Sequence, residues 1–298
     1  DLERIGQTLC AGDIITTGGS TVKGVVGYDL TKLLCGSEGT LGIITRIILR
    51  LLPLPETRKT MLAIFDSIDG AAGAVSMIIR NRIIPTTLEF MDHSALTCVK
   101  DQFDLGLSPE AKAVLIIELD GERDLVEKQA ERIGTLIRPL GLVEFKAAAD
   151  ATEAEELWKA RRLISPALKK VNPDKINEDI VVPRSRVPDI IRRIDAIREH
   201  YGIPIVNFGH AGDGNIHVNI MIDRSIPGEG EKAEHAVREI FRATLEMGGT
   251  MSGEHGVGLS KAPYIPLELS PNQIAAMKAI KRALDPKNIL NPGKIFPD

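Results

Sequence analysis

The strongest chemical signal in the sequence is a glycine-rich segment that carries two histidines. It reads GHAGDGNIHVN over residues 209–219, and His210 and His217 are seven positions apart. The glycines permit a tight reversal between one strand that His210 closes and a second strand that His217 opens. We expect this reversal to bring the two imidazoles side by side.

A second glycine-rich segment places a carboxylate next to an imidazole. It reads GGTMSGEHGVG over residues 248–258, and Glu254 directly precedes His255. Successive side chains of an extended backbone diverge, so one residue can face a metal while the other faces a substrate. Two histidines and one glutamate can form a facial ligand set on a divalent metal and leave positions open for a substrate.

Each segment alone has an ordinary explanation. A glycine-rich loop by itself indicates only a turn, and a single histidine at a strand end is usually a hydrogen-bonded surface or core residue. The two segments share an unusual glycine density, and together they hold three of the six histidines. In combination they favour a metal site or an active site.

These residues need strands and helices to hold them in place. We predict strands at residues 43–52, 61–65, 86–91, 113–119, 179–182, 203–208 and 216–222, and helices at residues 69–80, 123–140, 151–170, 187–201, 230–247 and 271–284. Pro53-Leu54-Pro55 breaks the chain after the first strand and indicates a domain boundary. Two strand-helix-strand passages indicate a ferredoxin-like α+β fold, with helices covering one face of an antiparallel sheet.

The composition excludes several classes of protein. The net charge of −4 over 298 residues argues against a general nucleic-acid binder. No apolar stretch approaches the ~20 residues that a transmembrane helix needs. Cys10, Cys35 and Cys98 lack CxxC spacing, which is typical of a reducing compartment such as the cytoplasm. The chain begins with a polar stretch and without an initiator Met, so we expect no secretory signal peptide and interpret the chain as a fragment.

Several longer runs carry a resemblance to a known family. HAGDGNIH at 210–217, GEHGVG at 253–258 and DPKNILNPGKIF at 285–296 resemble the C-terminal domain of FAD-linked oxidases. This family holds glycolate oxidase flavin subunits, D-lactate dehydrogenases and D-2-hydroxyglutarate dehydrogenase. YDL at 28–30 and GSEGTLGIIT at 36–45 resemble the end of the family's flavin-binding domain. The resemblance covers essentially the whole chain.

The resemblance implies a division of the chain into three parts. Residues 1–56 would be the C-terminal remnant of a PCMH-type FAD-binding domain, and residues 57–270 a domain that binds substrate and metal. Residues 271–298 would form a helix and tail that return to the flavin domain. The family's glycine-rich pyrophosphate loop has no counterpart in residues 1–35, so we expect this fragment alone to be inactive.

The resemblance also implies a role for each matching residue. It makes His210, His217 and Glu254 ligands of a divalent metal, zinc or manganese, and His255 the general base. It makes Arg161, Ser165 and Asn219 substrate-binding residues. It assigns FAD contacts to Gly36, Ser37, Glu38, Gly39, Thr40, Gly42, Ile43 and Asn291. Asn177 stands near the position where the hydroxyglutarate enzymes carry a lysine, and Lys175 is close enough to substitute.

The function implied is an FAD-dependent dehydrogenase that oxidises glycolate or D-lactate to the 2-oxo acid. A 2-hydroxy acid can chelate a metal, and coordination lowers the pKa of its hydroxyl group, as it does for metal-bound water. His255 could then take the proton, while the hydride passes to the flavin. Arg161 could hold the substrate carboxylate in a bidentate fork.

Other functions remain open at this point. D-2-hydroxyglutarate dehydrogenase is the alternative within the family, although Asn177 in place of a lysine disfavours a second substrate carboxylate. A metal-dependent hydrolase could use the same ligands, but it would leave residues 36–45 unexplained. A catalytically silent binding module is a third alternative. A nicotinamide-binding Rossmann loop is disfavoured because residues 36–42 are spaced GxxGxxG and precede a strand, where that fingerprint needs a helix.

The resemblance implies a separate electron acceptor, either an iron-sulphur subunit or an electron-transfer flavoprotein. The sequence has no cluster-binding cysteines of its own, which motivates a partner protein. We expect a homo-oligomer or a hetero-complex without a transmembrane segment. It would be cytoplasmic, or attached to the membrane periphery through its partner.

Overall fold

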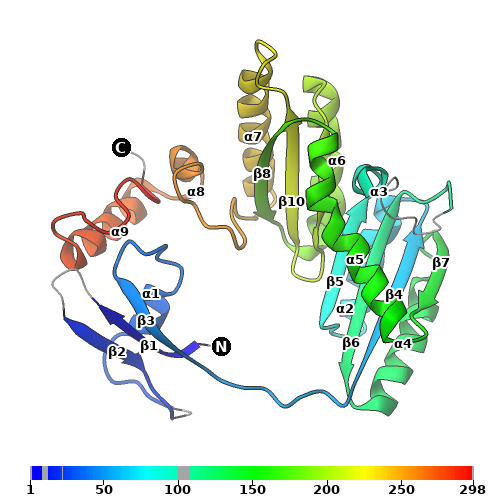
Figure 1. The fold of residues 1–298 in the computed structure, drawn as a ribbon, viewed down its shortest axis with the longest axis horizontal. Helices are drawn as coiled ribbons and strands as arrows, with labels where there is room; N and C mark the ends of the chain where they lie inside the picture. Colours follow the sequence, from blue (N-terminus) through cyan, green and yellow to red (C-terminus); the bar gives the residue numbers. More distant parts are fainter. Residues whose placement is uncertain (1, 9–12, 22, 100–107, 297–298) are drawn as a thin grey trace. The chain divides into compact units, whose positions relative to one another are not determined.

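The computed structural model describes residues 2–8, 13–21, 23–99 and 108–296 and divides the chain into two compact units (Figure 1). The terminal unit combines Asp1–Leu54 with Glu254–Asp298. The central unit is Pro55–Gly253.

The central unit is built on a seven-stranded antiparallel sheet in the order β7-β4-β6-β5-β9-β10-β8. Its strands are β4 (Thr57–Phe65), β5 (Thr87–Asp92), β6 (Ala113–Gly121), β7 (Leu142–Ala147), β8 (Asp174–Val181), β9 (Ile205–His210) and β10 (Asn215–Ile222). Its helices are α2 (Ile68–Arg80), α3 (His93–Val99), α4 (Arg123–Ile137), α5 (Ala151–Ala167), α6 (Val187–Tyr201) and α7 (Glu229–Glu246), with 3₁₀ turns η1 (Leu168–Lys170) and η2 (Arg184–Arg186). The predicted α+β class is confirmed.

Two ferredoxin-like passages make up this sheet. The strands of the first passage, β4, β5, β6 and β7, lie in the order β7-β4-β6-β5, as a βαββαβ unit requires. The second passage supplies β8, β9 and β10 in the order β9-β10-β8. Beside β8, bridges join Val181 to Thr250 and Asp179 to Ser252. The segment that leads to Glu254 therefore lies where the fourth strand of the second unit would be.

Helices cover both faces of the sheet, whereas the sequence indicates helices on one face. Helices α3 and α5 pack on the face that presents Leu62 and Ile116. Met61 and Ala63 alternate with Leu62, so they point to the opposite face, and they are fully buried as well. Helices α2, α4, α6 and α7 contact one another and this second face. Residues 61–65 of β4 and 113–117 of β6 are apolar on both sides for this reason.

Local sequence sets where the helices begin and end. The Ser67 side chain accepts a hydrogen bond from the Gly70 N–H and caps the start of α2. Helix α6 ends at Gly202, whose φ of 62° is the left-handed conformation that favours glycine after a helix. The predicted helix 187–201 is thereby confirmed.

The terminal unit draws on both ends of the chain. Its elements are β1 (Leu2–Thr8), β2 (Ile14–Gly18) and β3 (Ile43–Leu49) in the order β2-β1-β3, with α1 (Leu30–Leu34), η3 (Ala262–Tyr264), α8 (Ile265–Glu268) and α9 (Pro271–Leu284). A small core of Leu34 and Leu41 packs against Leu284 of α9. The central unit ends at Gly253, earlier than the expected boundary at 270, because the residues that follow hydrogen-bond to the first part of the chain.

Cys35 and Cys98 are free, and Cys10 lies outside the described residues. Among the residues that the structure describes, none of the helices combines the length and the apolar character that crossing a bilayer requires.

Candidate active site

The two histidines of the first motif lie side by side. His210 ends β9, and His217 pairs with Phe208 across β9 and β10. The imidazole centroids are 5.2 Å apart, with their planes at 84°. Glycine is required in the turn between them, because a Cβ on Gly214 (φ +84°) would lie 2.0 Å from the Val182 carbonyl oxygen.

A buried glutamate joins His210 to the predicted substrate arginine. Glu89 of β5 accepts a hydrogen bond from Arg161 Nε of α5 at 2.6 Å, and its other oxygen is hydrogen-bonded to His210 Nδ1. The Arg161 guanidinium also lies 4.5 Å from the centroid of the Phe208 ring. Burial alone would raise the pKa of Glu89, but its hydrogen bond with His210 and the Arg161 charge outweigh burial and lower that pKa.

A buried aspartate, Asp179, lies next to His217, as Glu89 lies next to His210. Asp179 of β8 is the register partner of His217, and its Oδ1 lies 3.8 Å from His217 Nδ1. The carboxylate accepts hydrogen bonds from Asn215 Nδ2 at 2.6 Å and from the Gly253 N–H at 3.0 Å. Asp179 is fully buried. It therefore ties β8, the start of β10 and the residue before Glu254 together.

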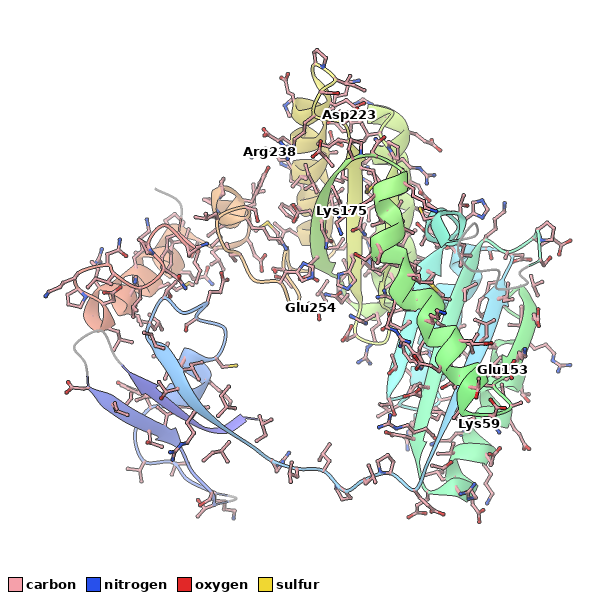
Figure 2. All side chains as sticks on the ribbon, in the orientation of Figure 1. Lys59, Glu153, Lys175, Asp223, Arg238 and Glu254 are labelled. Atoms are coloured by element: carbon pink, nitrogen blue, oxygen red, sulfur yellow. The ribbon has the colours of Figure 1, made fainter. Side chains whose placement is uncertain are left out.

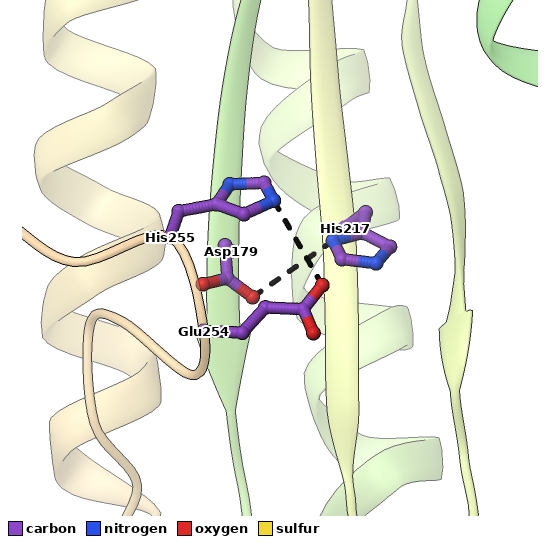
Figure 3. Close-up of side chains that lie close together, drawn as sticks. All are labelled: Asp179, His217, Glu254 and His255. Atoms are coloured by element: carbon purple, nitrogen blue, oxygen red, sulfur yellow. Dashed lines mark ion pairs between the residues drawn. The ribbon is translucent and has the colours of Figure 1, made fainter. Parts of the chain in front are cut away.

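Four side chains gather into a group that suits a divalent cation. Asp179, His217, Glu254 and His255 each offer one ligand atom, and these atoms all lie within 4.8 Å of one another (Figure 3). Glu254 follows Gly253 directly, and the hydrogen bond from the Gly253 N–H to Asp179 therefore keeps Glu254 close to Asp179. Two imidazoles and two carboxylates match the ligand preferences of zinc and manganese. The donor set thus fits the implied metal.

His210 stands next to this group through its ring contact with His217. The predicted ligand set of His210, His217 and Glu254 therefore stays a prediction, to which the geometry adds Asp179 as a neighbour. No local signature in the sequence identified Asp179 or Glu89. For Glu89 the available signal was an acidic residue between apolar residues of a strand, since a charge is rarely buried without a partner or a function. For Asp179 there was no such contrast, because β8 carries several other charged residues.

The predicted substrate residues lie on two elements of the central unit. Arg161 and Ser165 are one helical turn apart on α5. Asn219 lies two positions after His217 on β10, so both point to the same face of the sheet. Asn219 Nδ2 donates to the Val206 carbonyl at 3.1 Å, and its buried Oδ1 has no hydrogen-bond partner among the described residues. A buried acceptor of this kind is available to a substrate hydroxyl.

A cavity of about 540 Å³ opens beside Ser165. Two lysines, Lys169 and Lys175, line it together with Asn172. Lys175 Nζ lies 3.4 Å from Ser165 Oγ (Figure 2 labels Lys175). Burial, followed by the charge of Lys169, lowers the pKa of Lys175. Lys175 and Asn177 share one face of β8 with Asp179, so the cavity and the cation group lie along the same side of the sheet.

The residues predicted to contact FAD form a loop in the terminal unit. Gly36 and Gly39 have φ of 81° and 68°, and a Cβ on Gly36 would meet no atom within 4 Å. Open space beside a glycine allows a cofactor to approach the backbone closely. Asn291 joins the loop because its Nδ2 donates to the Glu38 carbonyl at 2.6 Å. These residues fit a flavin-binding role, which stays a prediction.

Lys281 anchors the same loop from α9. Its ammonium donates to the carbonyl oxygens of Thr40 and Leu290, each at 2.8 Å, and forms an ion pair with Asp285. Lys281 and Asp285 are both buried. A buried ammonium group is stable only when its hydrogen bonds are satisfied. The contacts of Lys281 therefore fix the loop at residues 36–42 to α9.

Comparison with known proteins places this chain in a family. The family described as FAD linked oxidases, C-terminal domain, matches residues 54–295. The chain belongs to this family. Over 97% of its length it is 49% identical to the glycolate oxidase subunit GlcD of Bacillus subtilis (strain 168), and over 96% it is 34% identical to a D-lactate dehydrogenase of Archaeoglobus fulgidus. The family recognised from the motifs is confirmed.

The chain spans about three fifths of the length of these relatives, 61% and 62% respectively. Among solved structures, it resembles p-cresol methylhydroxylase with a TM-score of 0.78 at 17% identity, covering all of this chain and 65% of the other. It resembles 4-ethylphenol oxidase of Gulosibacter chungangensis with a TM-score of 0.74 at 19% identity, covering all of this chain and 66% of the other. At such identities the likeness concerns the fold alone.

Proposed function

We propose that the protein carrying this chain is an FAD-dependent dehydrogenase that oxidises a small 2-hydroxy acid, glycolate or D-lactate, to the 2-oxo acid. The observation that carries the proposal is the pairing of Arg161 and His210 on one buried carboxylate, Glu89, beside the imidazole of His217. This arrangement sets a guanidinium that can bind an anion next to candidate metal ligands. Binding of a 2-hydroxy acid needs both, the guanidinium for the carboxylate and the metal for the hydroxyl group. The names of the two relatives support the same substrate class.

The chain's own residues divide the work of the reaction. Arg161 binds the substrate carboxylate, and Glu89 holds its guanidinium in place. The Asn219 Oδ1 accepts a hydrogen bond from the substrate and orients it. His255 receives the hydroxyl proton on its imidazole. His210, His217 and Glu254 would hold a divalent metal, which lowers the pKa of a bound hydroxyl, and bound FAD supplies the hydride acceptor.

A kinetic panel tests the proposal. We expect the purified flavin-loaded holoenzyme to oxidise glycolate or D-lactate with an artificial electron acceptor, and to reduce its flavin when the acid is added without acceptor. Turnover of neither acid would overturn the proposed substrates. A colourless, zinc-loaded protein that hydrolyses its substrate would replace the oxidase with the hydrolase alternative.

The cavity beside Ser165 favours a second candidate, D-2-hydroxyglutarate. Two lysines, Lys169 and Lys175, and one carboxylate, Asp174, line the cavity, and a distal carboxylate of the substrate would balance the remaining positive charge. Lys175 would then bind the distal carboxylate of the substrate as a cation, which the neutral side chain of Asn177 cannot do. In the same panel, Lys175→Met would raise the KM for D-2-hydroxyglutarate about tenfold or more and leave glycolate oxidation unchanged. Lys170→Met, an exposed neighbour on η1 that does not line the cavity, is the matched control.

We also propose that electrons leave the flavin to a separate acceptor, an iron-sulphur subunit or an electron-transfer flavoprotein, in the cytoplasm or at the membrane periphery. The word subunit in the name of the Bacillus relative supports a hetero-complex. Sustained reduction of oxygen by the purified holoenzyme without any partner would contradict a separate acceptor.

A further inference from the structure

Two carboxylates hold the short segment that carries Glu254 and His255. On one side, Asp179 accepts the N–H of Gly253 at 3.0 Å. On the other side, Glu38 accepts the N–H groups of Val257 and Gly258, one with each oxygen and each at 2.7 Å. The first contact lies within the central unit and the second within the terminal unit. Only Gly256 separates His255 from the contact with Glu38.

Glu38 occupies a backbone conformation that is unfavourable for a residue with a side chain. Its φ is 52°, in the left-handed region that glycine adopts readily. Glycine occurs at Gly36 and Gly39 in the same loop, also with positive φ. Strain at a non-glycine residue persists where surrounding contacts hold the residue in place. At Glu38 these contacts include the two hydrogen bonds with the backbone after His255.

The contact between Glu38 and this segment is also tightly fitted. Gly256 has a φ of 75°, and a Cβ on it would lie 2.7 Å from Glu38 Oε1. Glycine therefore lets the carboxylate come close to the backbone. The Asn291 side chain holds Glu38 through its carbonyl at 2.6 Å. The backbone of Glu38 is thus held in place, and its carboxylate can hold the segment that it contacts.

We propose that Glu38 is a positioning residue for His255, acting through the backbone N–H groups of Val257 and Gly258. Hydrogen bonds from backbone N–H groups to a carboxylate are among the stronger ones in proteins, and two of them set both place and orientation. The inference rests on the proposed function, in which His255 takes the substrate proton. In this proposal the Glu38 side chain holds the segment that carries His255, and the backbone of residues 36–42 contacts the flavin.

Amide hydrogen exchange measures this contact without any turnover. We would compare wild type, Glu38→Ala, Glu38→Gln and the control Asp29→Ala as flavin-loaded holoenzymes. Asp29 also accepts a backbone N–H, that of Lys32 at 3.1 Å in the same unit. In Glu38→Ala we expect the amides of Val257 and Gly258 to exchange about tenfold faster or more. Glu38→Gln keeps one acceptor oxygen and should show a smaller increase, and Asp29→Ala none.

Steady-state kinetics then ask whether the contact positions the base. In Glu38→Ala we expect kcat per bound flavin to fall about tenfold or more with KM changed less than about threefold, because a misplaced base slows proton transfer and leaves substrate binding intact. Glu38→Gln should recover part of kcat.

Either of two results would overturn the proposal. One is wild-type exchange at Val257 and Gly258 in Glu38→Ala, and the other is fast exchange with wild-type kcat. If the wild-type holoenzyme oxidised no 2-hydroxy acid, the proposed function would fail on its own. The exchange rates would then still decide whether Glu38 holds the segment.

Discussion

Glu89 is a buried carboxylate that serves two residues of the candidate site at once. It is 2% exposed, and it contacts both Arg161 and His210. Removing the charge from one member of a buried pair leaves the other charge uncompensated in a medium of low dielectric constant. Glu89 therefore stabilises the fold and the site through the same two contacts.

At the residue scale we predict that Glu89→Gln lowers the free energy of unfolding by about 3 kcal/mol, because Arg161, whose side chain is 14% exposed, would lose its counter-charge. Urea denaturation of wild type and variant at neutral pH measures the difference. The control is Glu127→Gln, which breaks a pair with Lys59 whose glutamate is 52% exposed. We expect the control to change stability by less than about 1 kcal/mol. Equal effects of the two substitutions would contradict a special role for Glu89.

The sequence predicts part of the candidate site and misses the rest for a physical reason. His210, His217, Glu254 and His255 stand out because glycine-rich runs surround them. Glu89 meets His210 across 121 positions of the chain, and such a contact exists only after the strands have paired. A single acid inside a strand has no local signature that reveals its partner.

At the element scale, the turn between β9 and β10 sets how the two imidazoles meet. The sequence predicts both strands, and the structure contains them with ends shifted by one or two residues. It does not predict α3 or β7. Helix α3 has seven residues, too few for helical periodicity to show, and β7 is an edge strand whose partly exposed side chains give little alternation.

Gly214→Ala tests this turn against a matched glycine. Both Gly214 and Gly202 have left-handed φ, but a Cβ on Gly214 would lie 2.0 Å from a carbonyl oxygen, whereas one on Gly202 would meet nothing within 4 Å. We expect Gly202→Ala to lower the free energy of unfolding by about 1 kcal/mol from backbone strain alone. Gly214→Ala adds a clash and should cost about 3 kcal/mol or more. Equal losses in urea denaturation would show that the close approach at Gly214 is unimportant.

At the scale of the whole molecule, the chain returns to its beginning after completing the central sheet. Glu38 contacts Val257 and Gly258 across about 220 positions, and Lys281 reaches Thr40 across 241. Pro53-Leu54-Pro55 predicts where the first part of the chain ends. The point of return, at Glu254, has no comparable signal, because it depends on which backbone groups find partners in the folded chain. The residues proposed for metal and proton transfer lie next to that point.

Metal analysis of the purified holoenzyme tests the central claim most directly, since the proposed oxidation depends on a cation held by His217 and Glu254. We predict about one divalent ion per chain in wild type and in the control His235→Ala, which alters an exposed histidine of α7. His217→Ala and Glu254→Ala should each lose the ion together with turnover of the hydroxy acid. Stoichiometric metal retained in both of these variants would contradict the claim.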